Sequence, residues 1–319
     1  MKQRRLLAYW GIGSLILATL TAAEILHGPT APESSVIWLL RVPRAITALI
    51  AGAALAVSGA QMQSIFRNPL ADPHILGVSA GAALGAAVAT MHPGAAGISV
   101  AISAFIGALV AASVILAVSR KFSSAATLLI FGVMSGFITN ALVTILQFST
   151  DSERLRIFYS WSAGNFSTST WQEIGIMVIA LVCGGAMAFR ERKGADIMLF
   201  GDEFASMAGA DIGSIRLRIL VSCCIMTGAV TAFCGPIGFI GITAPHIARA
   251  LCRTSANRIV LPASILSGCA ISLTADLASQ IAPAPIPVSS TMALIGIPVI
   301  IYMLLKRPAF SLAEEGGER

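Results

Sequence analysis

Long runs of apolar residues, separated by short polar stretches, constrain this chain more than any other feature. A helix needs about 20 mostly apolar residues to cross the hydrocarbon core of a bilayer. Such runs lie at 6–26, 43–65, 73–91, 96–118, 125–148, 171–189, 217–234, 237–251, 258–280 and 288–305. We expect an all-α integral membrane protein with about ten transmembrane helices in one polytopic domain, residues 1–319. The eighth run is short and contains Pro245, so a half-helix is the alternative for it.

The basic residues follow the positive-inside rule for ten crossings. With the N-terminus in the cytoplasm, the inner loops and tails hold 17 of the 21 lysines and arginines. Arg41, Arg44, Arg154 and Arg156 fall outside. We therefore expect both termini in the cytoplasm and the chain in the cell inner membrane. The opening MKQRR and the apolar run after it also fit a cleavable signal peptide, but the run is long for a signal core and is interpreted as the first crossing.

The composition argues against several other classes of protein. The chain is 56% hydrophobic and 11% charged, whereas soluble domains carry about a quarter charged residues. The net charge of +6 follows from membrane orientation, and no Lys/Arg stripe with interleaved aromatics indicates a nucleic-acid partner. The six cysteines and four histidines lack disulfide or metal-ligand spacing, so we expect no metal site and cysteines that pack as small apolar residues.

The sequence offers no energy source within the chain itself. It has no GxxxxGK[ST] phosphate loop, so ATP and Mg²⁺ are expected on a partner and no cofactor on this chain. Intramembrane acids mark ion and proton pathways, and Asp276, near the outer end of the ninth run, is the clear candidate. A transport subunit driven from outside is therefore favoured over a secondary carrier or channel. A membrane enzyme finds no His, Asp and Ser constellation at a shared depth.

Small residues and a repeated order of motifs indicate how the helices are arranged. Gly77, Gly81 and Gly85 are spaced GxxxGxxxG, and Gly132 and Gly136 repeat the spacing. Such faces let helices approach closely, and they equally suit the lining of a wide pathway. An arginine-flanked helix followed by a Gly/Pro-broken segment occurs twice with opposite sidedness, ending in RNPLADPHILGVSAG and in CGPIGFIGITAPH. This order predicts an inverted repeat of helices 2–5 and 7–10.

The stretch LFGDEFASMAGADIGSIRLR, residues 199–218, is a polar insert in an apolar chain. Asp202 is predicted to cap a short helix, with Glu203 in its first turn. Gly209 is predicted to end that helix in a left-handed conformation. Asp211 would then cap a second short helix leading to the seventh crossing.

The first of these short helices also has the pattern of a docking surface. Phe204 and Met207 share one face and form an apolar knob inside a polar rim, which is typical of protein contacts. The alternative is a solvated connecting loop.

Four blocks of the sequence resemble one family. They are RVPRAITALIAGAALAVSGAQMQSIFRNPLADPHILGVSAGAALG (41–85), GDEFASMAG (201–209), GPIGFIGITAPHIAR (235–249) and LPASILSGCAISLTADLA (261–278). They resemble the FecCD-type permeases, the membrane subunits of binding-protein-dependent ABC importers for ferric siderophores, haem and vitamin B12. The resemblance implies the type II ABC importer permease fold, and a ferric siderophore is the expected substrate, with vitamin B12 or haem as the alternatives.

The resemblance also implies partners. These are a second permease subunit in a homodimer or close heterodimer, two cytoplasmic ATPase subunits, and a periplasmic or lipid-anchored substrate-binding protein.

Site residues follow from the resemblance position by position. The coupling segment, 190–216, would contact the ATPase through Gly201, Asp202, Glu203, Phe204, Ala205, Met207, Gly209 and Asp211. Arg41 and Arg44 would dock the binding protein, the alternative being that they anchor a helix end in the lipid headgroups. A cytoplasmic gate would comprise Ser79, Ala80, Gly81, Ser123 and Ser124.

The chain departs from the family pattern at three places. Gln280 stands where relatives often have arginine, Pro285-Ile286-Pro287 replaces an ELP, and Phe204 stands where many relatives have arginine. At the first two places we expect docking of the binding protein to be weaker or differently arranged, whereas at Phe204 the contact stays in place and its charge pattern changes.

Overall fold

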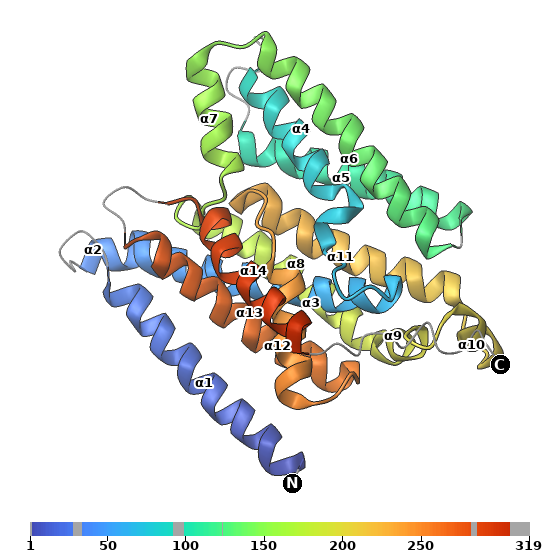
Figure 1. Cartoon of the computed structure of the whole chain (residues 1–319). Helices are drawn as coiled ribbons and strands as arrows, with labels where there is room; N and C mark the ends of the chain where they lie inside the picture. Colours follow the sequence, from blue (N-terminus) through green and yellow to red (C-terminus); the bar gives the residue numbers. More distant parts are fainter. Residues whose placement is uncertain (1, 28–33, 92–98, 123, 282–285, 307–319) are drawn as a thin grey trace.

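The computed structural model describes residues 2–27, 34–91, 99–122, 124–281 and 286–306, and all regular elements in these ranges are helices (Figure 1). The first half contains α1 (Lys2–Leu26), α2 (Ser34–Val36), the π-helix η1 (Ile37–Arg41), α3 (Val42–Phe66), the 3-10 helix η2 (Pro73–Leu76), α4 (Val78–Met91), α5 (Val100–Lys121), α6 (Ala125–Phe148) and α7 (Ser152–Ser162). The second half contains α8 (Trp171–Arg190), α9 (Arg192–Met198), α10 (Asp202–Met207), α11 (Ile212–Cys234), α12 (Ile240–Cys252), α13 (Asn257–Ser279) and α14 (Val288–Lys306). The all-α prediction is confirmed.

The number of full membrane crossings stays a prediction. All ten apolar runs lie on helices, but among the described residues seven helical stretches are long and apolar enough to span a bilayer. These are Tyr9–Leu26, Ser34–Phe66, Val100–Lys121, Ala125–Phe148, Trp171–Arg190, Ile212–Cys234 and Asn257–Ser279. The helix α4 has 14 residues and α12 has 13, so both are short for a crossing. Phe239, in a left-handed conformation, precedes α12.

The helix α3 forms the centre of the structure. It is the most buried of the seven candidate spans and packs against α11, α12 and α13. A Cβ at Gly52 would lie 2.5 Å from the Gly268 oxygen of α13, and one at Gly59 would overlap the backbone of Gly241 in α12. Glycine is required at both crossings because membrane helices associate through such close backbone contacts.

The glycines of the small-residue spacing have different surroundings in the structure, and the lining of a pathway stays a prediction. Gly81 and Gly85 of α4 contact the backbone of α5 at Gly107 and Ser103, so these glycines serve helix packing. By contrast, a Cβ at Gly136 on α6 would meet no atom within 4 Å. The spacing alone does not distinguish these cases. It shows where small residues lie, but not whether another helix packs against them.

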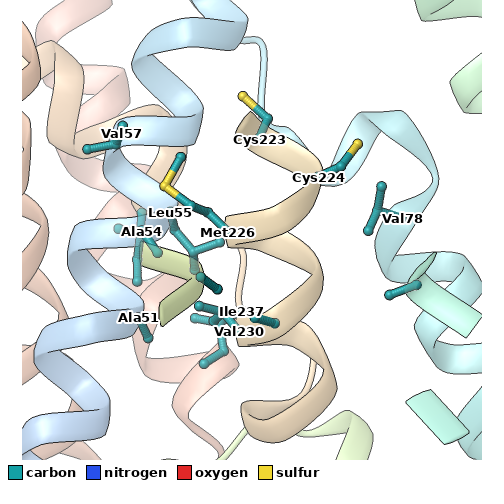
Figure 2. Close-up of a cluster of buried hydrophobic side chains, with 14 of the residues drawn as sticks. Ala51, Ala54, Leu55, Val57, Val78, Cys223, Cys224, Met226, Val230 and Ile237 are labelled. Carbon is teal, nitrogen blue, oxygen red and sulfur yellow. The ribbon is translucent and has the colours of Figure 1, made fainter. Parts of the chain in front are cut away.

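The helix α11 packs against α3 on one side and α4 and α5 on the other. Figure 2 shows Met226 and Val230 of α11 beside Leu55 and Ala54 of α3, with Val78 of α4 across from Cys224. The cysteines are free, and all are buried except Cys183. Among the described residues, no group of three His, Cys, Asp or Glu side chains is placed to hold a metal ion.

The peripheral helices are attached to different degrees. Tyr9 of α1 donates a 2.7 Å hydrogen bond to the carbonyl of Ala263 in α13, so α1 packs on the bundle. Figure 1 shows α4, α5, α6 and α7 grouped on the side of the molecule away from α1. Within α6 only Leu128, Gly132 and Val143 are buried. That helix therefore presents most of its surface outward.

We predict that Gly59→Leu prevents stable folding, because its side chain would overlap the backbone of α12. Overpacking a close contact costs about 3 kcal/mol or more. The matched control is Gly136→Leu on α6, which enters open space and should leave stability unchanged. The measurement is the monodisperse fraction of detergent-solubilised protein after heating. Equal stability of the two variants would show that the α3–α12 contact is looser than described.

Candidate functional site

The polar insert forms one short helix followed directly by α11. The predicted first helix is present as α10, and Gly209 follows it with φ +77°, as predicted. Asp211 caps α11 by accepting from the backbone N–H of Ser214 (3.1 Å) and from its hydroxyl (2.6 Å). These bonds lower the pKa of the Asp211 carboxyl. The prediction of a second short helix was wrong. Residues Ile212 to Cys234 form one continuous helix, α11, which contains the run predicted as the seventh crossing.

The prediction that Asp202 caps α10 was also wrong. The N-cap position belongs to Gly201, with φ +105°, and Asp202 is the first helical residue. The Asp202 carboxylate instead accepts a 2.9 Å hydrogen bond from the Arg216 guanidinium of α11. A charged partner binds a carboxylate more strongly than a backbone N–H does, so the tertiary contact displaces the local cap.

The exposed surface of this region is an aromatic and apolar knob. Phe200, Phe204 and Met207 are 72%, 49% and 81% exposed, and the rings of Phe200 and Phe204 lie 5.3 Å apart. Ala205, on the opposite face, is fully buried and seats α10 on the protein. We call these three exposed residues the coupling knob. Sequence reasoning missed Phe200, although its place directly before Gly201 was a usable signal.

Polar pairs connect this region to the membrane helices. Besides Asp202–Arg216, Glu191 at the end of α8 pairs with Arg218 at 2.9 Å. The Asp196 carboxylate of α9 accepts from the backbone N–H (2.7 Å) and side-chain amide (2.8 Å) of Asn257, the first residue of α13. The segment from 191 to 211 is therefore bonded to both α11 and α13.

Arg216 is the most unusual of these groups because it is only 1% exposed. Its Nη2 meets Asp202, but Nε and Nη1 have no hydrogen-bond partner among the described residues. Removing the single carboxylate partner of a buried guanidinium is costly, because it leaves an unpaired charge in the protein interior. The position of α10 is thus tied to that of α11.

The two arginines predicted for docking are both engaged within the chain. Arg41 is buried and donates to the carbonyls of Ile25 (3.1 Å) and Leu26 (2.9 Å) at the end of α1. Arg44 donates two bonds, of 2.8 and 2.7 Å, to the Asp276 carboxylate of α13. Together these contacts hold the C-terminal ends of α1 and α13 to the N-terminal end of α3.

A second buried carboxylate lies close to Arg44 and Asp276. Glu24 of α1 lies 3.5 Å from Arg44 and accepts a 2.6 Å bond from Gln280, the position at which the sequence departs from the family pattern. Sequence reasoning identified Asp276 as the clear intramembrane acid and missed Glu24. An acid close to the end of an apolar run was the available signal.

The candidate gate residues occupy two separate places. Ser79, Ala80 and Gly81 form the first turn of α4, where Ser79 is buried 3.4 Å from the Thr231 hydroxyl of α11. Ser124 caps α6 by accepting from Thr127. Ser123 lies outside the described residues. The gate assignment therefore stays a prediction.

Comparison with known proteins agrees with this architecture. A model of the FecCD transport family matches residues 6–306. The chain belongs to the FecCD transport family.

Similar FecCD permeases include the cobalamin import permease BtuC of Halobacterium salinarum, 33% identical over 91% of this chain and 79% of that protein. The hemin transport permease HmuU of Yersinia pestis is 35% identical over 85% of this chain and 84% of that protein. A solved inward-facing metal-chelate type ABC transporter superposes with a TM-score of 0.85 at 27% identity, covering 94% of this chain and 99% of that one. This FecCD chain thus has the fold of ABC importer permeases, and its class is a transport subunit, not an enzyme.

We predict that Asp276→Asn destabilises the protein far more than Glu24→Gln. Removing Asp276 leaves Arg44 without its two-bonded partner, and breaking a buried pair costs about 3–5 kcal/mol. Removing the Glu24 charge relieves the repulsion between two carboxylates that share one guanidinium. Thermal unfolding of the purified variants checks the order, and an equal loss in both would contradict it.

We also predict that Asp202→Ala is rescued by a second change. The single variant strands the buried Arg216 charge and should cost about 3 kcal/mol. The double variant with Arg216→Met replaces that charge by an apolar side chain of similar length and should recover most of the loss. The readout is a double-mutant cycle in thermal stability, and purely additive losses would mean that the two residues do not depend on one another.

Proposed function

We propose that this chain is the permease subunit of an ATP-driven importer that carries a metal-bound organic chelate into the cytoplasm. The coupling part of this proposal rests on one observation. The coupling knob is exposed at α10, and the first residue of that helix is bonded to α11. The knob supplies an aromatic anchor of the kind that dominates protein interfaces. In this function it contacts a separate ATPase subunit, which binds ATP and Mg²⁺.

The polar pairs give that contact a route to the membrane helices. When two ATPase subunits close on ATP, they displace residues 201–215, and Asp202–Arg216 passes the displacement to α11. The path then switches between outward- and inward-facing states. ATP drives this switch only if the two states differ in their affinity for it.

The proposal also includes the membrane orientation, a second copy of the chain and the binding protein. The chain would lie in the inner membrane with both termini in the cytoplasm, as a homodimer. The exposed side chains Ile130, Phe137, Ile138 and Ile145 on α6 supply apolar surface that a second copy could cover. For the periplasmic or lipid-anchored binding protein, Arg44 is the better docking candidate because its side chain is 20% exposed at the outer end, whereas Arg41 is buried.

The substrate is proposed by class and tested directly. A ferric siderophore is our first candidate, and the names of the relatives make cobalamin and haem the alternatives. The experiment reconstitutes the permease with its ATPase and binding protein and measures ATP-dependent uptake of a ferric siderophore, haem and cobalamin. Uptake of one of them identifies the substrate, and uptake of none while the ATPase is active overturns the proposed class.

We predict that Gly209→Val uncouples ATP hydrolysis from uptake. The positive φ strains any branched residue, which changes how α10 sits relative to α11. The matched control is Gly213→Val in the first turn of α11, where φ is ordinary and the nearest atom to a Cβ is 3.6 Å away. Uptake per ATP hydrolysed in proteoliposomes should fall about tenfold for Gly209→Val and stay near the wild-type value for the control. Unchanged transport in both would contradict the coupling role.

A further inference from the structure

The chain contains the same tripeptide in both of its interrupted segments. Pro73-His74-Ile75 lies between α3 and α4, and Pro245-His246-Ile247 lies in α12, just after the break that follows α11. The proposed function uses neither histidine, although both are half-buried, His74 in the break between α3 and α4 and His246 within α12, next to Pro245.

Each histidine contacts a backbone carbonyl of the other segment. The Nε2 atom of His74 lies 2.8 Å from the carbonyl oxygen of Ile237, between α11 and α12. The Nε2 atom of His246 lies 2.8 Å from the carbonyl oxygen of Pro69, between α3 and α4. Because a carbonyl oxygen only accepts, each Nε2 carries a proton and donates it. We call these two reciprocal bonds the histidine latch.

Buried non-helical backbone makes such bonds necessary. Broken helices at membrane depth are tolerated where side chains or neighbouring helices satisfy the freed backbone groups. Ile237 is buried, and its carbonyl accepts a hydrogen bond from His74. The segments also touch at Gly241. Its carbonyl accepts a 3.2 Å hydrogen bond from Gln63, and a Cβ added at this glycine would lie only 2.7 Å from the Pro73 ring.

The latch also leads to the candidate gate. With Nε2 protonated, the Nδ1 atom of His74 accepts, and it faces the hydroxyl of Ser79 in the first turn of α4. Ser79 in turn lies within 3.4 Å of Thr231 on α11. One side chain therefore connects the end of α11 with the start of α4.

We propose that His74 and His246 are positioning residues that transmit the movement of α11 to the first turn of α4. The displacement begins at Asp202–Arg216, passes along α11 to the Ile237 carbonyl, and reaches Ser79 through His74. His246 holds the opposite side, so the two interrupted segments move as one body. This assignment rests on the proposed function for its role in transport, but the latch itself is a property of the chain alone.

The experiment compares variants that keep the donor with variants that remove it. Glutamine places an N–H close to the Nε2 position, whereas leucine offers none. The set is His74→Gln, His74→Leu, His246→Gln and His246→Leu, with His27→Leu, an exposed histidine outside the latch, as the control.

Two readouts separate the latch from the proposed function. Hydrogen–deuterium exchange on the solubilised permease should rise at least about tenfold in residues 67–77 and 235–241 of the leucine variants, and stay at the wild-type rate in the glutamine variants. This measurement needs no substrate and no ATPase. Wild-type exchange in the leucine variants would overturn the latch, whatever the chain transports.

The second readout is the ratio of substrate imported to ATP hydrolysed. The leucine variants should lose about tenfold in this ratio while retaining ATPase activity. His246→Gln should be rescued, whereas His74→Gln keeps the bond to Ile237 but lacks the Nδ1 contact with Ser79 and should stay uncoupled. If uptake and ATPase activity fall together with thermal stability, the histidines are only structural, and the positioning role is wrong. If the latch opens but the wild type imports no chelate, the proposed function fails and the latch remains.

Discussion

Backbone groups that lie within hydrocarbon must find their partners inside the protein, and this structure depends on how that requirement is met. Unbroken helices such as α3 and α11 meet it by themselves. The breaks between α3 and α4 and between α11 and α12 do not, and they lie against each other. There the two histidines bond the carbonyls of Ile237 and Pro69, and Gln63 bonds that of Gly241 in the first turn of α12. Gly59 and Gly241 bring the backbones of α3 and α12 into contact.

Few charged side chains are available in this chain, and the structure uses them to join helices. Arg44, Asp276 and Glu24 meet where the C-terminal ends of α1 and α13 lie against the N-terminal end of α3. Asp202 with Arg216, and Glu191 with Arg218, do the same where the short helices meet α11. A buried charge is costly unless it is paired. Each pair therefore fixes the relative position of two elements, which makes these residues sensitive to substitution even though none of them performs chemistry.

The sequence predicted the features that depend on local composition. Apolar runs became helices, Asp211 became a cap, and Gly209 adopted a positive φ, because each depends on a few neighbouring residues. Predictions failed where a distant residue competes. Asp202 was expected to bind its own helix, but Arg216 lies 14 positions away in sequence and takes the carboxylate. Glu24 and its partner Gln280 are 256 positions apart, so no local pattern could join them.

The candidate sites show the same division. The location of the coupling knob could be read from the apolar pair Phe204 and Met207 and from Gly209. Phe200, whose signal was its place before Gly201, was missed until the turn there brought its ring against Phe204. The docking arginines were identified by their external position, which does not reveal that Asp276 and the end of α1 already bind them.

The sparse packing of α6 gives the bilayer itself a part in the structure. Its 24 residues extend over about 36 Å at 1.5 Å per residue, whereas the hydrocarbon core is about 30 Å thick. A helix longer than the membrane accommodates the mismatch by tilting. Because only Leu128, Gly132 and Val143 of α6 are buried within the chain, wherever a second copy leaves this helix facing lipid, we expect its tilt to follow lipid chain length more closely than that of the deeply packed α3. Membrane thickness thereby becomes a determinant of the conformation of this helix.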